Sequence, residues 1–109
     1  MKDDKIYLQH IRDAIQKIET YSMGGKESFY KNTQVQDAVI RNLEIIGEAV
    51  KNLSVNLKNN HQDIPWRKIA GMRDEMIHEY FGVDLEIVWN VLEKDLPKLK
   101  SKVDQILSN

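Results

Sequence analysis

The segment from Gly71 to Gly82 holds residue types that could carry out chemistry on a phosphodiester. It places Arg73, His78 and Tyr80 within eight positions of one another. An arginine is a fixed cation that can fork onto a phosphate, and a histidine gains and loses a proton near neutral pH. Because the chain has no cysteine, thiol catalysis, disulfides and cysteine-based metal sites are excluded. These residues therefore predict phosphodiester chemistry done by side chains alone.

Helical spacing decides which of these side chains can meet. At about 100° per residue, Arg73 and His78 lie about 140° apart around an ideal helix, so they do not share a face. Arg73 and Tyr80 nearly do, and Asp74 and His78, four positions apart, can contact each other. Arg73 and His78 can reach one phosphate if the helix unwinds near His78, which Gly82 favours, or if a two-fold partner supplies a second motif. We expect a composite site.

The residue types also indicate how a ribonuclease would work here. His78 would act as general acid or base on the ribose 2′-hydroxyl or the leaving oxygen, while Arg73 would stabilise charge on the phosphoryl oxygens. Asp74 would hold the imidazole in its orientation. Asp74 and His78 supply only two ligands where a stable metal site usually has three or four, so we expect no metal. The reaction would leave a 2′,3′-cyclic phosphate and fail on DNA.

Composition indicates a single soluble domain. The chain has 109 residues, of which 41% are hydrophobic and 30% charged, as in an ordinary globular protein. No apolar run approaches the roughly 20 residues of a spanning helix, and the N-terminus lacks the apolar region of a signal peptide. We therefore expect a cytoplasmic protein with no membrane partner. The net charge of -1 argues against a broad nucleic-acid surface, although Arg41, Arg67 and Lys68 could form a local basic patch.

Apolar residues recur at helical spacing along most of the chain, and nothing alternates with the period of a strand. The first predicted helix ends near Gly24 and Gly25, and residues 26–31 form a short helical turn or a packed loop. The second begins at Asn32 or Thr33, either of which can cap it. The apolar stripes of these two helices are Leu8, Ile11, Ile15 and Ile18, then Val39, Leu43, Ile46, Val50, Leu53 and Leu57.

The second half of the chain predicts two or three more helices. Residues 59–63 form a polar connector, and Pro65 then starts a third helix that runs to Tyr80. Asp84 caps a fourth helix, and Pro97 either starts a new helical stretch or kinks the old one. The stripes are Trp66, Ile69, Met72 and Met76, then Leu85, Val88, Leu92 and Leu96, and lastly Leu99, Val103 and Ile106.

These segments predict an all-α fold, a single domain over residues 1–109 built as an antiparallel bundle of four or five helices. Trp66 and Trp89 are expected in the core, and His10 and His61 are expected at the surface. Extra hydrophobic residues widen the apolar faces, which favours burial in a homodimer. They are Ile40, Ile45, Trp89 and Val91.

Three blocks of the sequence resemble the HEPN superfamily in its HepT-type toxin branch. They are QDAVIRNLEIIGEA at residues 36–49, IPWRKIAGMR at residues 64–73 and YFGVD at residues 80–84. Arg73, His78 and Tyr80 match the Arg-x4-His-x-Tyr motif of that family. The similarity covers essentially the whole chain, and three blocks in the same order are a more specific signal than the motif alone.

The resemblance implies an all-helical HEPN bundle that forms a homodimer, with two motifs facing one cleft. It implies an RNA endonuclease that needs no metal or cofactor, with Arg73 and His78 as catalytic residues, acting as the toxin of a type VII toxin–antitoxin pair. The partner would be a small nucleotidyltransferase antitoxin that silences the toxin by transferring AMP to Tyr80. The added phosphates would occupy Arg73 and repel RNA.

Two other functions stay open. The chain could be a non-catalytic helical dimer that serves the nucleotidyltransferase as a scaffold or substrate-presenting subunit. The acidic side chains of Asp74, Glu75 and Glu79 beside the motif favour that hypothesis, because they disfavour an RNA phosphate. The chain could also be a nucleotide-binding regulatory domain in which Arg73 holds a phosphate.

Overall fold

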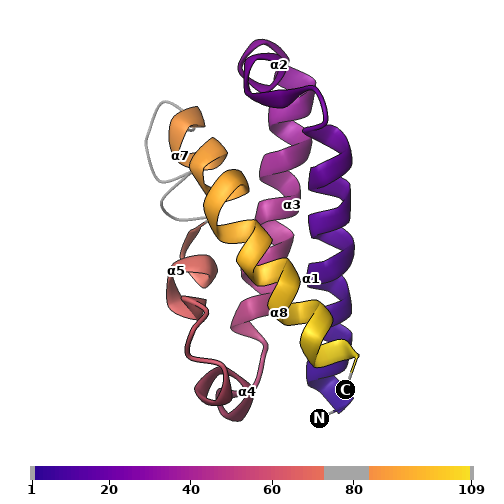
Figure 1. Cartoon of the computed structure of the whole chain (residues 1–109), viewed down its shortest axis with the longest axis vertical. Helices are drawn as coiled ribbons and strands as arrows, with labels where there is room; N and C mark the ends of the chain where they lie inside the picture. The colour runs from indigo at the N-terminus through magenta and orange to yellow at the C-terminus, as the bar shows by residue number, and fades with distance from the viewer. Residues whose placement is uncertain (1, 73–83, 109) are drawn as a thin grey trace.

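The computed structural model describes residues 2–72 and 84–108, and all the elements in these two ranges are helical (Figure 1). The long helices α1 and α3 run antiparallel side by side, and α8 crosses in front of them. The predicted all-α bundle is therefore confirmed. None of the helices in these ranges combines the length and the apolar character that crossing a bilayer needs. The elements are α1 (Lys2–Tyr21), α2 (Gly25–Lys31), α3 (Thr33–Lys51), α4 (Val55–Asn60), α5 (Trp66–Ala70), α7 (Leu85–Asn90), the π-helix η1 (Val91–Asp95) and α8 (Leu96–Leu107).

The core lies where α1, α3 and α8 face one another. The predicted stripe of α1 is at most 2% exposed, and Leu99 and Val103 of α8 are fully buried. Burying each such side chain contributes about 1.5–3 kcal/mol, which is why the helices associate along these stripes. Trp66 and Trp89 are 7% and 8% exposed, so both belong to the core as predicted.

The short helix α2 closes one end of the bundle. It begins at Gly25, whose φ of 86° lies in the left-handed region that glycine tolerates. The first of the two predictions for residues 26–31, a short helix, is confirmed. The ring of Phe29 is fully buried and its centroid lies 5.3 Å from that of Trp89, so α2 packs against α7.

Local capping sets the starts of α3 and α7 as predicted. The Asn32 side chain accepts a hydrogen bond from the backbone N–H of Val35 (3.2 Å). The Asp84 carboxylate accepts from the backbone N–H groups of Glu86 (3.0 Å) and Ile87 (3.3 Å). Each cap satisfies donors that a helix start leaves without a partner. Asp84 thereby fixes the start of α7 at Leu85.

The prediction of one helix extending to Leu57 was wrong, because α3 ends at Lys51 and α4 begins at Val55. Ser54 between them accepts from the backbone N–H of Leu57 (3.1 Å). The Ser54 backbone N–H and hydroxyl donate to the two carboxylate oxygens of Asp4, at 2.8 and 2.6 Å. Asp4 is 4% exposed, so this buried contact ties the start of α1 to the turn and breaks the helix there.

The predicted third helix begins as predicted but is interrupted at Gly71 in its described part. The helix α5 ends at Ala70, Gly71 forms a turn and Met72 is helical, consistent with the cost of about 1 kcal/mol of a glycine inside a helix. The remainder of the predicted helix, residues 73–80, lies outside the described residues. A Cβ at Gly47 of α3 would stand 3.3 Å from the carbonyl oxygen of Ile69, so this glycine allows α5 to lie close against α3.

Residues 85–107 form one continuous helical rod, seen in orange to yellow in Figure 1. The backbone N–H of Leu96 donates to the carbonyl oxygen of Val91, five residues earlier, which defines the π turn of η1. Pro97 stands in the first turn of α8, where the missing N–H of a proline costs little. The rod therefore continues past the proline with one widened turn before it.

Candidate functional site

The predicted motif lies outside the described residues. Arg73, Asp74, His78 and Tyr80 all belong to residues 73–83, so their predicted roles stay predictions. The structure describes the two residues that flank this segment. Met72, at one end, is 4% exposed, and the other end is the helix cap at Asp84.

A pocket lies next to Met72, with walls from α5, α7 and η1. Its cavity volume is about 300 Å³. We call it the α5–η1 pocket. It is lined by Lys68, Ile69, Met72, Ile87, Asn90, Val91, Lys94 and Asp95.

Positive charge predominates in the α5–η1 pocket. The Lys68 ammonium lies 3.1 Å from the Asp95 carboxylate, with side chains 56% and 18% exposed. Lys94 is exposed and has no ion-pair partner among the residues that the structure describes. Of the three cations proposed from sequence for a basic patch, the structure places Lys68 at this pocket, whereas Arg41 lines a different one.

Sequence reasoning missed the polar residues of this pocket on the rod. The sequence did not predict Asn90, Lys94 or Asp95 as site residues, because none of them belongs to a recognised motif. A signal was present, since residues 87, 90, 91, 94 and 95 follow the spacing of a single helix face. That face carries an asparagine and a lysine beside hydrophobic residues, in contrast to a purely apolar stripe.

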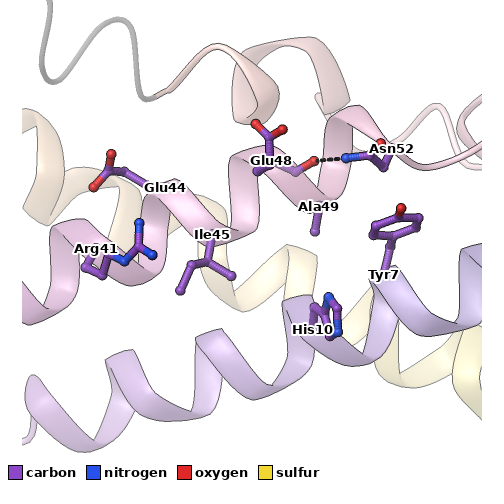
Figure 2. Close-up of a pocket in the computed structure, with 8 residues that line it drawn as sticks. All are labelled: Tyr7, His10, Arg41, Glu44, Ile45, Glu48, Ala49 and Asn52. Carbon is purple, nitrogen blue, oxygen red and sulfur yellow. Dashed lines mark hydrogen bonds between the residues drawn. The ribbon is translucent and has the colours of Figure 1, made fainter.

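A second pocket, the α1–α3 pocket, lies between the two long helices (Figure 2). Its cavity volume is about 440 Å³. The rings of Tyr7 and His10, on α1, meet edge to face with their centroids 6.1 Å apart. The Asn52 side-chain amide donates to the backbone oxygen of Glu48 (2.9 Å). The lining residues are Tyr7, His10, Arg41, Glu44, Ile45, Glu48, Ala49 and Asn52.

Ion pairs on α8 change the proton affinity of two surface groups. The hydrogen bond from Lys102 holds the pKa of the Asp63 carboxyl below its ordinary value, and the two side chains are 3.0 Å apart. The hydrogen bond to Glu19 raises the pKa of the Lys100 ammonium. Lys100 and Lys102 thus each bind a carboxylate within the chain, whereas Lys94 has no ion-pair partner among residues 2–72 and 84–108.

The structure corrects one part of the argument for a homodimer. Trp89 and Val91 are buried within the chain itself, at 8% and 5% exposed, so they are not available to a partner. Ile40 and Ile45 are half-buried against the core. His10 is exposed, as predicted, whereas His61 is half-buried and its backbone oxygen accepts a hydrogen bond from the Trp66 indole N–H (2.9 Å). Within residues 2–72 and 84–108, no three or more histidine, aspartate or glutamate side chains gather in a way that could hold a metal ion.

Comparison with known proteins identifies the family. A family model described as "Ribonuclease HepT-like" matches residues 11–106. The chain belongs to the HepT-like ribonuclease family. The resemblance noted from the three sequence blocks is confirmed. The matched span includes the predicted motif and most of both pockets.

Members of this family are similar to the chain over nearly its whole length. It is 44% identical to a "Probable ribonuclease HepT" of Thermococcus cleftensis, with 96% of each chain covered. It is 43% identical to a "Putative RNase" of Caldanaerobacter subterraneus, over 98% of this chain and 96% of that protein. A Methanocaldococcus jannaschii protein named "Gamma-glutamylcyclotransferase and putative RNase" is 49% identical over 97% of this chain, which spans 48% of that protein. No solved structure matches the chain significantly.

Proposed function

We propose that this chain is a metal-independent RNA endonuclease that acts as a homodimer and is the toxin of a type VII toxin–antitoxin pair. The observation that carries the proposal is membership of the HepT-like ribonuclease family over residues 11–106, a span that contains Arg73 and His78. Two of the similar proteins are named as ribonucleases, and the chain matches each of them along nearly its entire length. The residue types at the motif supply an acid–base group and a phosphate-binding cation.

The proposed reaction is a transesterification within the RNA. His78 removes the proton of the ribose 2′-hydroxyl, the 2′-oxygen bonds to phosphorus, and the 5′-oxygen leaves with a proton from the partner subunit's His78. Arg73 stabilises the charge that builds on the phosphoryl oxygens, and Asp74 orients the imidazole. The products are a 2′,3′-cyclic phosphate and a free 5′-hydroxyl.

The first experiment incubates metal-free protein with total cellular RNA in EDTA and analyses the ends of the products. We expect the wild type to cleave and His78→Ala to lose about 10²–10⁴-fold of its rate. Arg73→Ala should lose a comparable factor. His10→Ala is the matched control, because His10 is an exposed histidine on α1. If His10→Ala abolished cleavage, or if His78→Ala cleaved normally, the proposed mechanism would be wrong.

Regulation would act through Tyr80. We propose that a nucleotidyltransferase antitoxin transfers AMP to the Tyr80 hydroxyl, adding negative charge beside Arg73 and repelling RNA. Intact mass after incubation with such an enzyme and ATP should rise by whole AMP units in the wild type and stay constant in Tyr80→Phe. A mass increase in Tyr80→Phe equal to that of the wild type would place the modification elsewhere.

The second candidate is a non-catalytic binding module for the nucleotidyltransferase. Acidic residues favour it, namely Asp74, Glu75 and Glu79 beside the motif. This function predicts that unmodified wild type leaves every RNA intact, while the complex with the nucleotidyltransferase survives His78→Ala. Cleavage of RNA that requires His78 would exclude it.

A further inference from the structure

The α5–η1 pocket combines an apolar floor with a polar rim. Its volume of about 300 Å³ lies at the lower end of the range for small-ligand sites, about 300–1,000 Å³. Ile69, Met72 and Val91 line it and are at most 5% exposed, whereas Asn90 and Lys94 are exposed. Such a pocket can cover the apolar face of a flat ligand and bind its polar edge.

The π turn of η1 forms part of this pocket. Val91 and Asp95, the first and last residues of η1, both line the cavity. A π turn widens an α-helix locally and is frequently found at functional sites, because regular α-helical hydrogen bonding would be the more stable alternative. This irregularity marks the same face of the rod that carries Asn90 and Lys94.

Charge indicates which class of ligand fits. Asp95 is paired with Lys68, whereas Lys94 has no ion-pair partner among the described residues. Among the residues that the structure describes, the lining carries two lysines and one aspartate, a net charge of +1. A phosphate would give Lys94 a charge-assisted hydrogen bond that the described part of the chain does not provide. The pocket therefore favours an anionic ligand over a neutral or cationic one.

A nucleotide has the shape that the other residues require. The faces of a base are apolar enough to pack on Ile69, Met72 and Val91, and the edge of a base carries donors and acceptors. The Asn90 amide offers both a donor and an acceptor, as asparagine does where it reads bases. A base inside an RNA duplex is stacked and out of reach, so the matching ligand is single-stranded RNA.

We propose that the α5–η1 pocket is a nucleotide subsite for single-stranded RNA, in which Lys94 binds a phosphate and Asn90 binds the edge of the base. This inference rests on the proposed ribonuclease function. Met72 lines the pocket and directly precedes Arg73 in the sequence, which favours a bound nucleotide that flanks the scissile phosphate. The subsite thereby influences which base stands beside the cleaved bond.

A binding experiment tests the subsite in the His78→Ala background, where the RNA stays intact. Fluorescence anisotropy with short labelled oligoribonucleotides should show that Lys94→Gln weakens binding about tenfold. It should also reduce the slope of log K against log salt by about 0.7, the contribution of one phosphate on a single strand. Lys17→Gln is the matched control, because Lys17 is an exposed lysine on α1; it should change neither quantity.

Base selection is tested separately through Asn90. Asn90→Ala should reduce the ratio of affinities between the preferred and the least preferred homopolymer about five- to tenfold, with little change in the salt slope. Lys94→Gln should weaken all homopolymers alike. Thermal melts check that both variants fold, as expected for exposed positions. Equal ratios in Asn90→Ala and its parent would remove Asn90 from the subsite.

Turnover separates failure of the subsite from failure of the proposed function. With His78 present, Lys94→Gln should raise KM while kcat stays within about twofold, since it removes binding energy shared by substrate and transition state. If wild type cleaves RNA and Lys94→Gln behaves as Lys17→Gln does, the subsite is wrong and the ribonuclease stands. If wild type neither binds nor cleaves RNA, the ribonuclease proposal fails and the subsite fails with it.

Discussion

The two pockets differ in a way that volume does not capture. The α1–α3 pocket is the larger, at about 440 Å³ against about 300 Å³, but its walls carry Glu44 and Glu48 against Arg41. The α5–η1 pocket has two lysines against one aspartate. A polyanion such as RNA is attracted by the excess of lysine in the α5–η1 pocket. Between these two pockets, the sign of the charge favours the smaller α5–η1 pocket as the candidate RNA site.

The elements that form the two pockets differ as well. The α1–α3 pocket lies between helices of 20 and 19 residues that share the core. The α5–η1 pocket lies between α5 with five residues, α7 with six and the π turn. Binding residues are commonly held by short elements and connections on a rigid scaffold. The seam between α1 and α3 is therefore better suited to stability than to binding.

Reversing one charge in each pocket should reveal the largest difference between them. We expect Lys94→Glu to lower kcat/KM on single-stranded RNA about 100-fold, because it replaces attraction for phosphate by repulsion. Glu48→Lys should leave kcat/KM unchanged or raise it slightly, since Glu48 is exposed and lies outside the proposed RNA subsite. Steady-state kinetics at fixed salt measures both. A larger loss in Glu48→Lys than in Lys94→Glu would place the RNA in the α1–α3 pocket.

Loosening the α1–α3 seam should affect stability without affecting chemistry. Asp4→Ala leaves the Ser54 backbone N–H and hydroxyl without their buried acceptor. We expect a loss of about 2 kcal/mol in the free energy of unfolding, with kcat/KM per folded molecule unchanged. Asp3→Ala is the matched control, because Asp3 is the exposed neighbour in the same first turn. Chemical denaturation provides the free energy; equal stability of the two variants would contradict the structural role of Asp4.

The same contact shows why part of the fold could not be predicted from the sequence. The caps at Asn32 and Asp84 were predictable, because a cap joins a side chain to backbone N–H groups two or three residues away. The break before α4 was not, because it depends on Asp4, fifty positions from Ser54 in the chain. Leu53 and Leu57 keep helical spacing across the break, so periodicity alone extended the helix.

The candidate site likewise has one part that the sequence predicts and one part that only the structure reveals. Arg73, His78 and Tyr80 were predicted from the sequence, because a motif is a local pattern that can be recognised without knowledge of the fold, and they stay predictions. The α5–η1 pocket required the structure, since Lys68 and Asp95 meet across a separation of 27 positions. The π turn was also beyond sequence reasoning, because the apolar stripe continues through it without interruption and only the hydrogen bond of Leu96 to Val91 reveals it.

Placing a tryptophan in each pocket tests which of the two cavities must stay open for RNA to bind. Ile87 and Ile45 line the α5–η1 and α1–α3 pockets respectively, and Ile87 is 38% exposed. We expect Ile87→Trp to occlude the base and raise KM about tenfold, which corresponds to ~1.4 kcal/mol. Ile45→Trp should leave KM unchanged. Should tryptophan at position 87 lower KM instead, the ring would be serving as a stacking surface for a base and the pocket itself would not hold one.

The smallest expected effect concerns a lysine whose charge is already committed. Lys102 is 15% exposed and bonds to Asp63, whose pKa it lowers. The pKa of Asp63 is lower in the folded state than in the unfolded state. The ion pair therefore stabilises the fold at pH values above the unfolded-state pKa, and this stabilisation is lost as the pH falls through the folded-state pKa. Asp63→Asn should therefore lower the Tm slightly at neutral pH and not at all in strong acid.

The same variant releases the Lys102 cation, so a small gain in RNA affinity at neutral pH is expected. It should remain well below the loss caused by Lys94→Gln, because Lys102 lies outside the α5–η1 pocket.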